Sequence, residues 1–335
     1  MFDSDQPVII AFVAIITFAI TFVSTPIIAR IMRRRGVIGT DVHKVSRIEI
    51  PEMCGLAILI GLTFGSLTYF SIDPSSGNEI TAFLATTLIA GAIGFLDDLR
   101  PLSARVKPLL TVLASLPIIL LHAYTPYPMI PLLGTVTLTI VYPVLILVAI
   151  PVTSNAVNMM DVMNGSMPGT ASIIMATMTV ILLISGKIHT AAISIGVLAA
   201  SLAFFYYNRF PAKVFSGDTG SLAVGAALGA IAILGRIEIV MVVALIPQIM
   251  NAFYGLSSVG RLYERREIPQ RPIRLLDDGS LESSAERRAP VTLARLILAR
   301  GSATEREVVG GMMILTVVSS MMAILTYCIT VVIKP

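Results

Sequence analysis

Long apolar runs alternate with short polar stretches along the whole chain. A helix that crosses a membrane needs about 20 apolar residues, because about 1.5 Å of rise per residue must span roughly 30 Å of hydrocarbon. Ten segments approach this length: 7–31, 53–71, 80–96, 107–123, 131–151, 169–186, 189–207, 220–235, 237–259 and 309–333. Prolines interrupt several of them, which is tolerated where neighbouring helices satisfy the freed carbonyls. The pattern predicts an all-α polytopic membrane protein with about ten transmembrane helices.

The overall composition agrees with this class. Of the 335 residues, 56% are hydrophobic and only 13% are charged, whereas a soluble domain carries about 25% charged residues. The mean hydropathy is +0.88. Residues 1–6 are too few and too acidic for the start of a signal peptide, so we expect the first apolar run to be a retained helix. No repeat divides the chain, and 1–335 is interpreted as a single integral membrane domain.

The basic residues are distributed very unevenly over the loops. The loops assigned to one face of the membrane are 32–52, 97–106, 152–168, 208–219 and 260–308. With their flanks, they hold 21 of the 24 lysines and arginines. The positive-inside rule therefore places this face in the cytoplasm and both termini outside, in a multi-pass protein of the cell membrane. Because the charge is confined to loops beside the membrane, the net charge of +4 does not indicate nucleic-acid binding.

One loop is long enough to form a structure of its own. Residues 260–307 separate the last two apolar segments. Within them, 272–284 (PIRLLDDGSLESS) places an Asp-Gly turn between two short runs, which predicts a β-hairpin. In 290–300, Arg295 and Arg300 are spaced among apolar residues, which suits a helix lying at the membrane interface. We expect a small α/β cytoplasmic insertion between the last two helices.

An acidic pair ends the third apolar segment. Asp97 and Asp98 stand at the mouth of a predicted helix, where charge near the membrane is costly and adjacent carboxylates repel each other. Such a pair persists where a cation or a basic partner neutralises it; a simple polar helix end is the alternative. Arg100, Arg105 and Lys107 follow at once and are candidates to bind phosphate.

The third loop of this face is rich in amides. Asn155, Asn158, Asp161 and Asn164 follow an i, i+3 spacing, so a helix over 155–165 would place all four on about one face. Their oxygens suit a hard cation or the imide edge of a pyrimidine. A polar turn between two spans is the alternative interpretation.

The fourth loop leads through small residues directly into a helix. The sequence SGDTGS (216–221) leaves backbone N–H groups free at a helix start, which is an arrangement that binds phosphate. Asp218 is interpreted either as the N-cap of that helix or as a metal ligand. Phe215 beside it is a candidate to stack on a base, with packing between helices as the alternative.

Further cations come from the first and fifth loops, namely Lys44, Arg47, Arg271 and Arg274. Cations beside a membrane commonly contact lipid headgroups or set topology, so these four are ambiguous when taken alone. Acids, amides and cations nevertheless occur together on one face in separate loops. Carboxylate and amide ligands beside glycine-rich phosphate cradles indicate Mg²⁺-dependent chemistry on a phosphorylated substrate.

Five segments, in this order, resemble motifs of the polyprenyl-phosphate N-acetylhexosamine-1-phosphate transferase superfamily. They are DVHKVSRIEIPE (41–52), GFLDDLRPLSARVKPLL (94–110), NAVNMMDVMNG (155–165), NRFPAKVFSGDTGS (208–221) and QRPIRLLDDGSLE (270–282). The resemblance covers nearly the whole chain and is closest to the eukaryotic and archaeal branch, UDP-GlcNAc–dolichyl-phosphate GlcNAc-1-phosphotransferase. These integral membrane enzymes move a sugar-1-phosphate from a UDP-sugar to a lipid phosphate.

The resemblance implies roles for particular positions. Asn158 and Asp218 match the family's Mg²⁺ ligands, with Mn²⁺ as an alternative ion. Asp97 and Asp98 match an acidic pair that acts as general base or organises the substrate. Lys107 matches a catalytic lysine that binds the pyrophosphate.

Further positions match the substrate contacts of the family. Arg271 matches a fifth-loop arginine on the diphosphate, and Asn164 and Phe215 match positions that hold uracil. Asp161 matches an aspartate of the bacterial branch and is placed with them at the nucleotide. Val162 departs from the pattern, because it replaces a glycine that would approach the base. The His-rich fifth-loop motif of the bacterial cell-wall branch is absent, which argues against a muramyl-pentapeptide substrate.

The resulting hypothesis is transfer of GlcNAc-1-phosphate from UDP-GlcNAc to polyprenyl or dolichyl phosphate at the cytoplasmic face, with release of UMP. The lipid phosphate attacks directly, or a double displacement passes through an aspartyl-phosphate. The membrane supplies the lipid partner, and the resemblance allows a homodimer. The main alternative is a membrane transporter of a phosphorylated or anionic solute, but its site would lie near the bilayer midplane between repeats. A CDP-alcohol phosphotransferase would need an aspartate-rich signature within one helix, which is missing.

Overall fold

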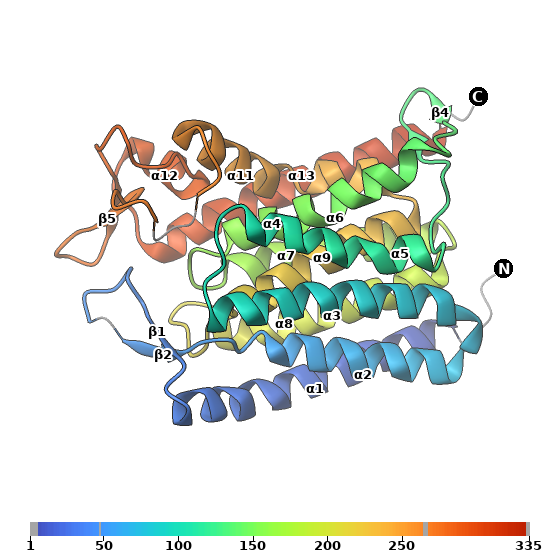
Figure 1. Ribbon diagram of the computed structural model, residues 1–335, viewed down its shortest axis with the longest axis horizontal. Coiled ribbons are helices and arrows are strands. Elements are labelled where there is room, and N and C mark those ends of the chain that lie inside the picture. The colour runs from blue at the N-terminus through green and yellow to red at the C-terminus, as the bar shows by residue number, and fades with distance from the viewer. Residues whose placement is uncertain (1–5, 47, 264–266, 333–335) are drawn as a thin grey trace.

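The computed structural model describes residues 6–46, 48–263 and 267–332. Its long helices run side by side in a bundle (Figure 1). The α-helices are α1 (Gln6–Arg34), α2 (Leu56–Ile72), α3 (Gly77–Leu99), α4 (Val106–Thr111), α5 (Leu116–Leu120), α6 (Val141–Met160), α7 (Ser166–Ile184), α8 (Ile188–Asn208), α9 (Gly217–Gly235), α10 (Glu238–Ala244), α11 (Ile246–Val259), α12 (Leu293–Ile297) and α13 (Glu305–Val332). Short 3₁₀ helices are η1 (Pro74–Ser76), η2 (Val112–Ser115) and η4 (Leu298–Arg300).

The strands form three short antiparallel hairpins. They are β1 (Ile38–Thr40) with β2 (Glu49–Pro51), β3 (Met129–Ile130) with β4 (Gly134–Thr135), and β5 (Ile273–Leu275) with β6 (Leu281–Ser283). Figure 1 shows β1, β2, β5 and α12 at one end of the bundle, which we call the head end. Helix α1 begins and α13 ends at the opposite end, beside β4, which we call the tail end.

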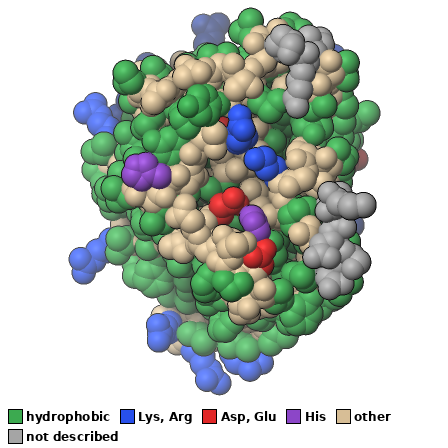
Figure 2. All heavy atoms as spheres, turned by 90° about the vertical axis from the view of Figure 1, so that its right-hand side faces the viewer, with side chains coloured by type: hydrophobic (Ala, Val, Ile, Leu, Met, Phe, Trp, Pro, Cys, Tyr) green, Lys and Arg blue, Asp and Glu red, His purple; other side chains and the backbone are tan. Residues whose placement is uncertain are grey.

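The chain is a multi-pass membrane protein. Within the described residues, seven helices are long and apolar enough to cross a membrane, and α10 with α11 makes an eighth span if the pair, bent by 66°, is counted as one. Their outward faces are apolar: Val8 is 69% exposed and Ile15 is 64% exposed. Seen from the tail end, hydrophobic side chains form most of the rim of the bundle (Figure 2). Such surface is stable only against lipid.

The span count differs from the ten that the hydropathy pattern predicts. All ten apolar segments contain helix, but α2 has only 17 residues, and the helical stretch Val106–Leu120 is also too short by the length criterion. Apolar composition locates buried segments, whether these face lipid or other helices, so it counts the two short helices as spans. Seven or eight spans is the number that helix length supports.

The boundaries of the fifth segment also differ from the prediction. Helix α6 runs from Val141 to Met160, whereas the apolar run suggested 131–151. The residues before it form the β3–β4 hairpin. A helix continues through polar residues when its neighbours satisfy them, and here this places Asn155 and Asn158 on the helix rather than in a loop.

The insertion between α11 and α13 contains the predicted hairpin. Strands β5 and β6 pair Leu275 with Leu281 around the Asp-Gly turn. The helix expected over 290–300 is confined to α12 and η4. The guanidinium of Arg295 donates to backbone carbonyls of the insertion, including Ser284 O at 2.8 Å. Arg295 therefore stabilises the fold of the insertion rather than contacting lipid.

Helix α9 is the centre of the bundle, and small residues set its distance from its neighbours. Within an apolar stretch of 18 residues of this helix, 89% of the residues are buried. A Cβ added to Gly94 of α3 would lie 2.2 Å from the Asp218 carbonyl oxygen. One added to Gly225 of α9 would lie 2.6 Å from Ser154 Cα on α6. Small residues let helix backbones approach closely in membranes, and here they bring the head-end termini of α3, α6 and α9 together.

The Gly94→Ala variant should separate α3 from α9. A methyl group at 2.2 Å from backbone requires a helix shift, and overpacking of this kind costs about 1–3 kcal/mol. We expect a lower thermal unfolding temperature in detergent. Gly310→Ala on α13 is the matched control, because nothing lies within 4 Å of its added Cβ. Equal unfolding temperatures for the two variants would contradict this account of the packing.

Candidate active site

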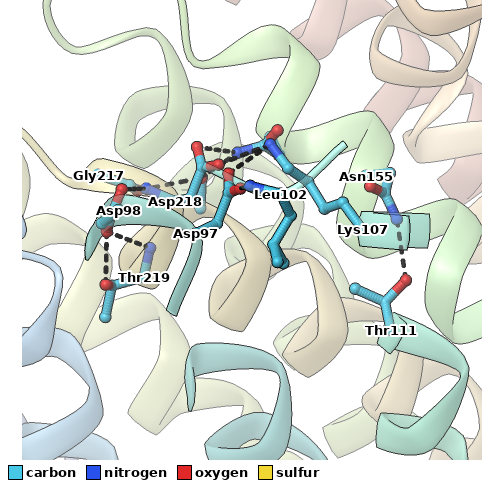
Figure 3. A network of polar contacts seen from close by, with 11 residues as sticks. Asp97, Asp98, Leu102, Lys107, Thr111, Asn155, Gly217, Asp218 and Thr219 are labelled. Carbon is cyan, nitrogen blue, oxygen red and sulfur yellow. Dashed lines mark hydrogen bonds and ion pairs between the residues drawn. The ribbon is translucent and has the colours of Figure 1, made fainter. Parts of the chain in front are cut away.

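A lysine from one helix lies between two aspartates from two others. The Lys107 ammonium, at the start of α4, is 2.7 Å from Asp97 Oδ2 and 2.7 Å from Asp218 Oδ2. Asp97 stands in the last turn of α3 and Asp218 in the first turn of α9, so segments far apart in the sequence meet here (Figure 3). The Lys107 and Asp97 side chains are 7% and 5% exposed, but that of Asp218 is 27% exposed. The cluster is a buried ion-pair network that meets the solvent at Asp218.

Asp98 uses its carboxylate to cap the next helix. Its Oδ1 accepts a hydrogen bond from the Asp218 N–H at 2.8 Å, and its Oδ2 accepts bonds from the Thr219 N–H at 3.0 Å and the Thr219 hydroxyl at 2.6 Å (Figure 3). Backbone N–H groups at a helix start have no partner within the helix. The interpretation of Asp218 as the N-cap of α9 is therefore wrong, because Asp218 lies within the helix and Asp98 accepts the hydrogen bonds of its first turn. So is the expectation that these two N–H groups are free to cradle phosphate.

Three cations follow the acidic pair, and the turn between α3 and α4 brings only Lys107 into the cluster. The Leu102 N–H donates to Asp97 Oδ1 at 2.5 Å, which fixes this turn against the acidic pair. Arg100 and Arg105, also candidates from sequence, are exposed. Only Lys107 points inward, and it is buried.

Asn158 approaches the same carboxylate from α6. Its Nδ2 donates to Asp218 Oδ1 at 2.8 Å and to Ser221 Oγ at 2.8 Å. Carboxylate and amide oxygens are ligands that Mg²⁺ accepts in proteins, usually together with substrate phosphates and water. Asp218 supplies a carboxylate and Asn158 an amide, although here the Asn158 nitrogen, and not its oxygen, faces Asp218. Among the described residues, no three His, Cys, Asp or Glu side chains are grouped so that they could hold a metal ion. An ion held by these two residues would take its other ligands from substrate phosphates and water.

The predicted polar stripe over 155–165 does not form. Helix α6 ends at Met160, so only part of this segment is helical. Asn155 donates to Thr111 Oγ1 at 3.1 Å and lies apart from Asp218 (Figure 3). The chain then leaves the helical path, and Gly165 adopts a positive φ of 88°.

Asp161 joins the two helix ends that carry Asn158 and Asp218. It caps the C-terminus of α6, and its Oδ2 accepts a hydrogen bond from Ser216 Oγ just before α9. Burial raises the pKa of Asp161 to about 7, although the bond from Ser216 acts in the opposite direction. The structure thus places this residue as a link between helices, with its carboxylate turned to protein.

Asn164 lies in a second polar cluster. Its Nδ2 donates to Asp41 Oδ2 at 3.0 Å, and its backbone N–H donates to Glu305 Oε1 at 2.8 Å. Lys44 is 2.6 Å from Asp41 Oδ2 and 4.9 Å from the centre of the Phe210 ring. Burial alone would raise the pKa of Asp41, but hydrogen bonds with Lys44 and Asn164 hold it below its usual value. The cluster ties the first loop and the α6–α7 turn to the start of α13.

Phe215 is held in place by backbone hydrogen bonds to the end of β2 and the residues that follow it. Its N–H donates to Pro51 O at 2.8 Å, and its carbonyl accepts from the Cys54 N–H at 2.9 Å. Glu52 lies next to its ring, since a Cβ on Gly39 would contact both side chains. Burial raises the pKa of Glu52, and the charge of Asp218 adds to this shift.

Sequence reasoning missed three acids that the fold brings to this end: Asp41, Glu52 and Glu305. The first two lie within the segment 41–52 that matches a family motif, which was their only signal. Of the fifth-loop cations, Arg271 and Arg274 are exposed, and no hydrogen bond or ion pair joins either to the Lys107 cluster in the part of the chain described. Arg47 lies outside the described residues.

The fold and the charge cluster are those of a polytopic membrane protein with a buried polar site at one end of its helix bundle. Comparison with known proteins identifies its class. Residues 80–236 match the family model "Glycosyl transferase family 4". A protein of Saccharolobus solfataricus, provisionally named a UDP-N-acetylglucosamine–dolichyl-phosphate N-acetylglucosaminephosphotransferase, is 30% identical over 74% of this chain and 82% of its own.

Bacterial relatives are similar to a comparable degree. A Bacillus subtilis protein, provisionally named an undecaprenyl-phosphate N-acetylglucosaminyl 1-phosphate transferase, is 30% identical over 79% of this chain and 74% of its own. The phospho-N-acetylmuramoyl-pentapeptide-transferase of Desulforamulus reducens is 33% identical over 68% and 74%. The chain therefore belongs to glycosyl transferase family 4 and is an enzyme that transfers an N-acetylhexosamine-1-phosphate to a polyprenyl phosphate.

The Asp161→Asn variant should change the pH dependence of stability. The folded protein holds the Asp161 proton up to about pH 7, while the unfolded chain releases it near pH 4, so wild-type stability falls as pH rises between these values. Asparagine has no proton to lose. We expect the variant to gain up to about 3 kcal/mol relative to wild type between pH 5 and pH 8, at about 1.4 kcal/mol per pKa unit.

Thermal unfolding of both proteins across this pH range measures the effect. Asp277→Asn, at an exposed turn position, is the matched control and should follow wild type at every pH. A constant difference between Asp161→Asn and wild type at all pH values would show that Asp161 is ionised throughout.

Proposed function

We propose that this enzyme transfers GlcNAc-1-phosphate from UDP-GlcNAc to a polyprenyl or dolichyl phosphate and releases UMP. The observation that carries the proposal is the Asp218 carboxylate, which is contacted by both Lys107 and Asn158 at the head end. Two further points support the choice of sugar: archaeal relatives bear the name of this activity, and the His-rich motif of the muramyl-pentapeptide enzymes is absent from the sequence.

In the proposed reaction, an oxygen of the lipid phosphate forms a bond to the sugar-bearing phosphorus of UDP-GlcNAc. The bond from that phosphorus to the bridging oxygen breaks, and UMP departs with the electron pair. Several phosphate charges must come together, so positioning and charge neutralisation are the main tasks of the protein. Lys107 is the buried cation of the site, and we propose that it neutralises part of the phosphate charge. Asp97 holds it in place through a 2.7 Å ion pair.

Asn158 and Asp218 are the residues that we propose hold Mg²⁺, with Mn²⁺ as an alternative ion. When bound, the metal supplies positive charge for the diphosphate and for the departing UMP. Asp98 has both oxygens engaged by the start of α9, so we assign it to positioning Asp218. Both oxygens of Asp97 are engaged too, by the Leu102 N–H and by Lys107. Asp97 nevertheless shares Lys107 with the more exposed Asp218, so we propose it as the group that receives a proton from the lipid phosphate.

For the nucleotide, we propose that Phe215 and Asn164 contact the uracil and that Asp161 supports them through Ser216. Glu52, beside the Phe215 ring, belongs to the same region. Arg271 stands in an exposed segment, and its assignment to the diphosphate requires that this segment approach the Lys107 cluster on substrate binding. The head end carries nearly all of the basic residues, which supports a cytoplasmic orientation of the site.

A donor assay tests the reaction itself. Purified protein with Mg²⁺ and a polyprenyl or dolichyl phosphate should convert radiolabelled UDP-GlcNAc into a lipid-soluble product and release one UMP for each sugar transferred. UDP-GalNAc and UDP-MurNAc-pentapeptide are the competing donors. Preferential transfer from either of them would overturn the assignment of the sugar.

The Asp218→Asn variant tests the site. It keeps the size of the side chain but removes the charge that Lys107 and the proposed metal share, so we expect transfer to fall at least about 100-fold. Asp277→Asn should retain activity. EDTA should abolish wild-type transfer, and added Mg²⁺ should restore it. Near-normal transfer by Asp218→Asn would remove this residue from the mechanism.

A further inference from the structure

A cavity of about 300 Å³ lies at the tail end, far from the residues discussed above. It is bordered by the ends of α7, α9 and α13 and by the start of α10. Asp218 stands at one end of α9 and the cavity-lining Gly235 at the other. At about 1.5 Å of rise per residue, the two are roughly 25 Å apart. The cavity is therefore not part of the transferase site.

Two cations line this cavity, and they are the described basic residues of the tail end. Lys187 and Arg236 come from different turns, yet both border the same space. Figure 2 shows two neighbouring basic side chains near the middle of this face. No acidic group lies within 4 Å of either one among the described residues. The buried acid Glu238, two residues further along, accepts a hydrogen bond from the Tyr142 hydroxyl, and its charge also interacts with that of Arg236.

Arg236 retains unused hydrogen-bonding capacity. Its Nη2 donates to Tyr127 O at 2.6 Å, which fixes the guanidinium, but its Nε is buried and has no hydrogen-bond partner. A buried donor without a partner costs stability, but the Nε itself is shielded from the cavity and is not a contact for a ligand there. Ser185, Tyr327 and Thr330 line the same cavity. Their hydroxyls are already engaged, because Ser185 donates to Ile181 O, Thr330 donates to Thr326 O, and Ser185 and Tyr327 hydrogen-bond to each other at 2.8 Å.

The backbone at Arg236 is also unusual. This residue follows α9 with φ 55° and ψ 44°, the left-handed conformation that normally selects glycine at a helix end. Gly186, at the corresponding position after α7, shows the ordinary solution with φ 69°. Arg236 is one of four non-glycine residues with positive φ among the described residues, so this turn holds a charged side chain at a position where glycine is usual.

The walls of the cavity continue into the lipid-facing surface. Ile184 and Val331 line it and are 70% and 41% exposed on the flank of the bundle. A soluble anion would gain nothing from these walls, whereas an acyl chain would cover them. Two cations at the membrane boundary, beside an apolar flank, match a phosphate ester with hydrocarbon chains.

We propose that this tail-end cavity binds the headgroup phosphate of an anionic phospholipid, with Lys187 and Arg236 as the phosphate ligands. The acyl chains lie along the flank at Ile184 and Val331. Binding at this place joins α7, α9 and α13 and stabilises the bundle without contact to the transferase residues.

The test is lipid-dependent thermal unfolding of the full chain in a neutral detergent. Added phosphatidylglycerol should raise the unfolding temperature of the wild type by about 3 °C or more, since a ligand of the folded state stabilises it. Phosphatidylcholine and inorganic phosphate should each give a much smaller rise. Native mass spectrometry should retain one phosphatidylglycerol on the wild-type protein.

Arg236→Gly and Lys187→Gln should lose most of the phosphatidylglycerol effect. Glycine suits the left-handed backbone at 236, so the first variant should fold at least as well as wild type, and Lys187→Gln decides the question if it does not. Arg287→Ala, which removes an exposed charge at the head end, is the matched control and should keep the full effect. An unchanged response in both tail-end variants, or an equal response to phosphatidylcholine, would overturn the site. Full stabilisation by inorganic phosphate alone would overturn its assignment to a lipid.

Discussion

The ammonium group of Lys107 between the carboxylates of Asp97 and Asp218 is the interaction on which the head end depends. Charges this deeply buried persist only when each has a partner, because removing one partner leaves an uncompensated charge in a medium of low dielectric constant. The three groups come from α3, α4 and α9, so the ion pairs also fix the relative positions of these helices. The same arrangement leaves Asp218 as the most exposed of the three, which places a negative charge at the mouth of the cluster, where a cation and phosphate groups can approach.

Close helix packing makes this arrangement possible. Gly94 and Gly225 allow α3 and α6 to approach α9 with backbone almost in contact, and Asp98 then reaches across to cap α9. Asp161 and Ser216 add a second link at the same level. The polar groups around the site therefore hydrogen-bond to one another. These bonds fix the positions of Asp218 and Asn158.

The two ends of the bundle have different tasks. The head end gathers the acids, amides and cations that we propose carry out the transfer of an N-acetylhexosamine-1-phosphate. It also holds a second cluster around Asn164 that joins the first loop to α13. The tail end carries few charges, and the unpartnered Nε of Arg236 stands out there because burial without a hydrogen bond is costly. The long, mostly apolar helices between the ends keep these two polar regions apart, so a lipid at the tail end would act on stability rather than on chemistry.

The sequence by itself determined the features that depend on local composition. Ten apolar segments, the Asp-Gly hairpin of the insertion and the gathering of Asp97, Asn158 and Asp218 at one face all follow from residue order and hydropathy. Tertiary structure alone decided which polar residue does what. It selected Lys107 over Arg100 and Arg105, made Asp98 the cap of α9, and turned Asn155 away from the site. It also brought in Glu305 from the far end of the chain. These choices depend on distances between helices that are set by contacts such as that of Gly94 with Asp218, and no local pattern in a sequence specifies the distance between two helices.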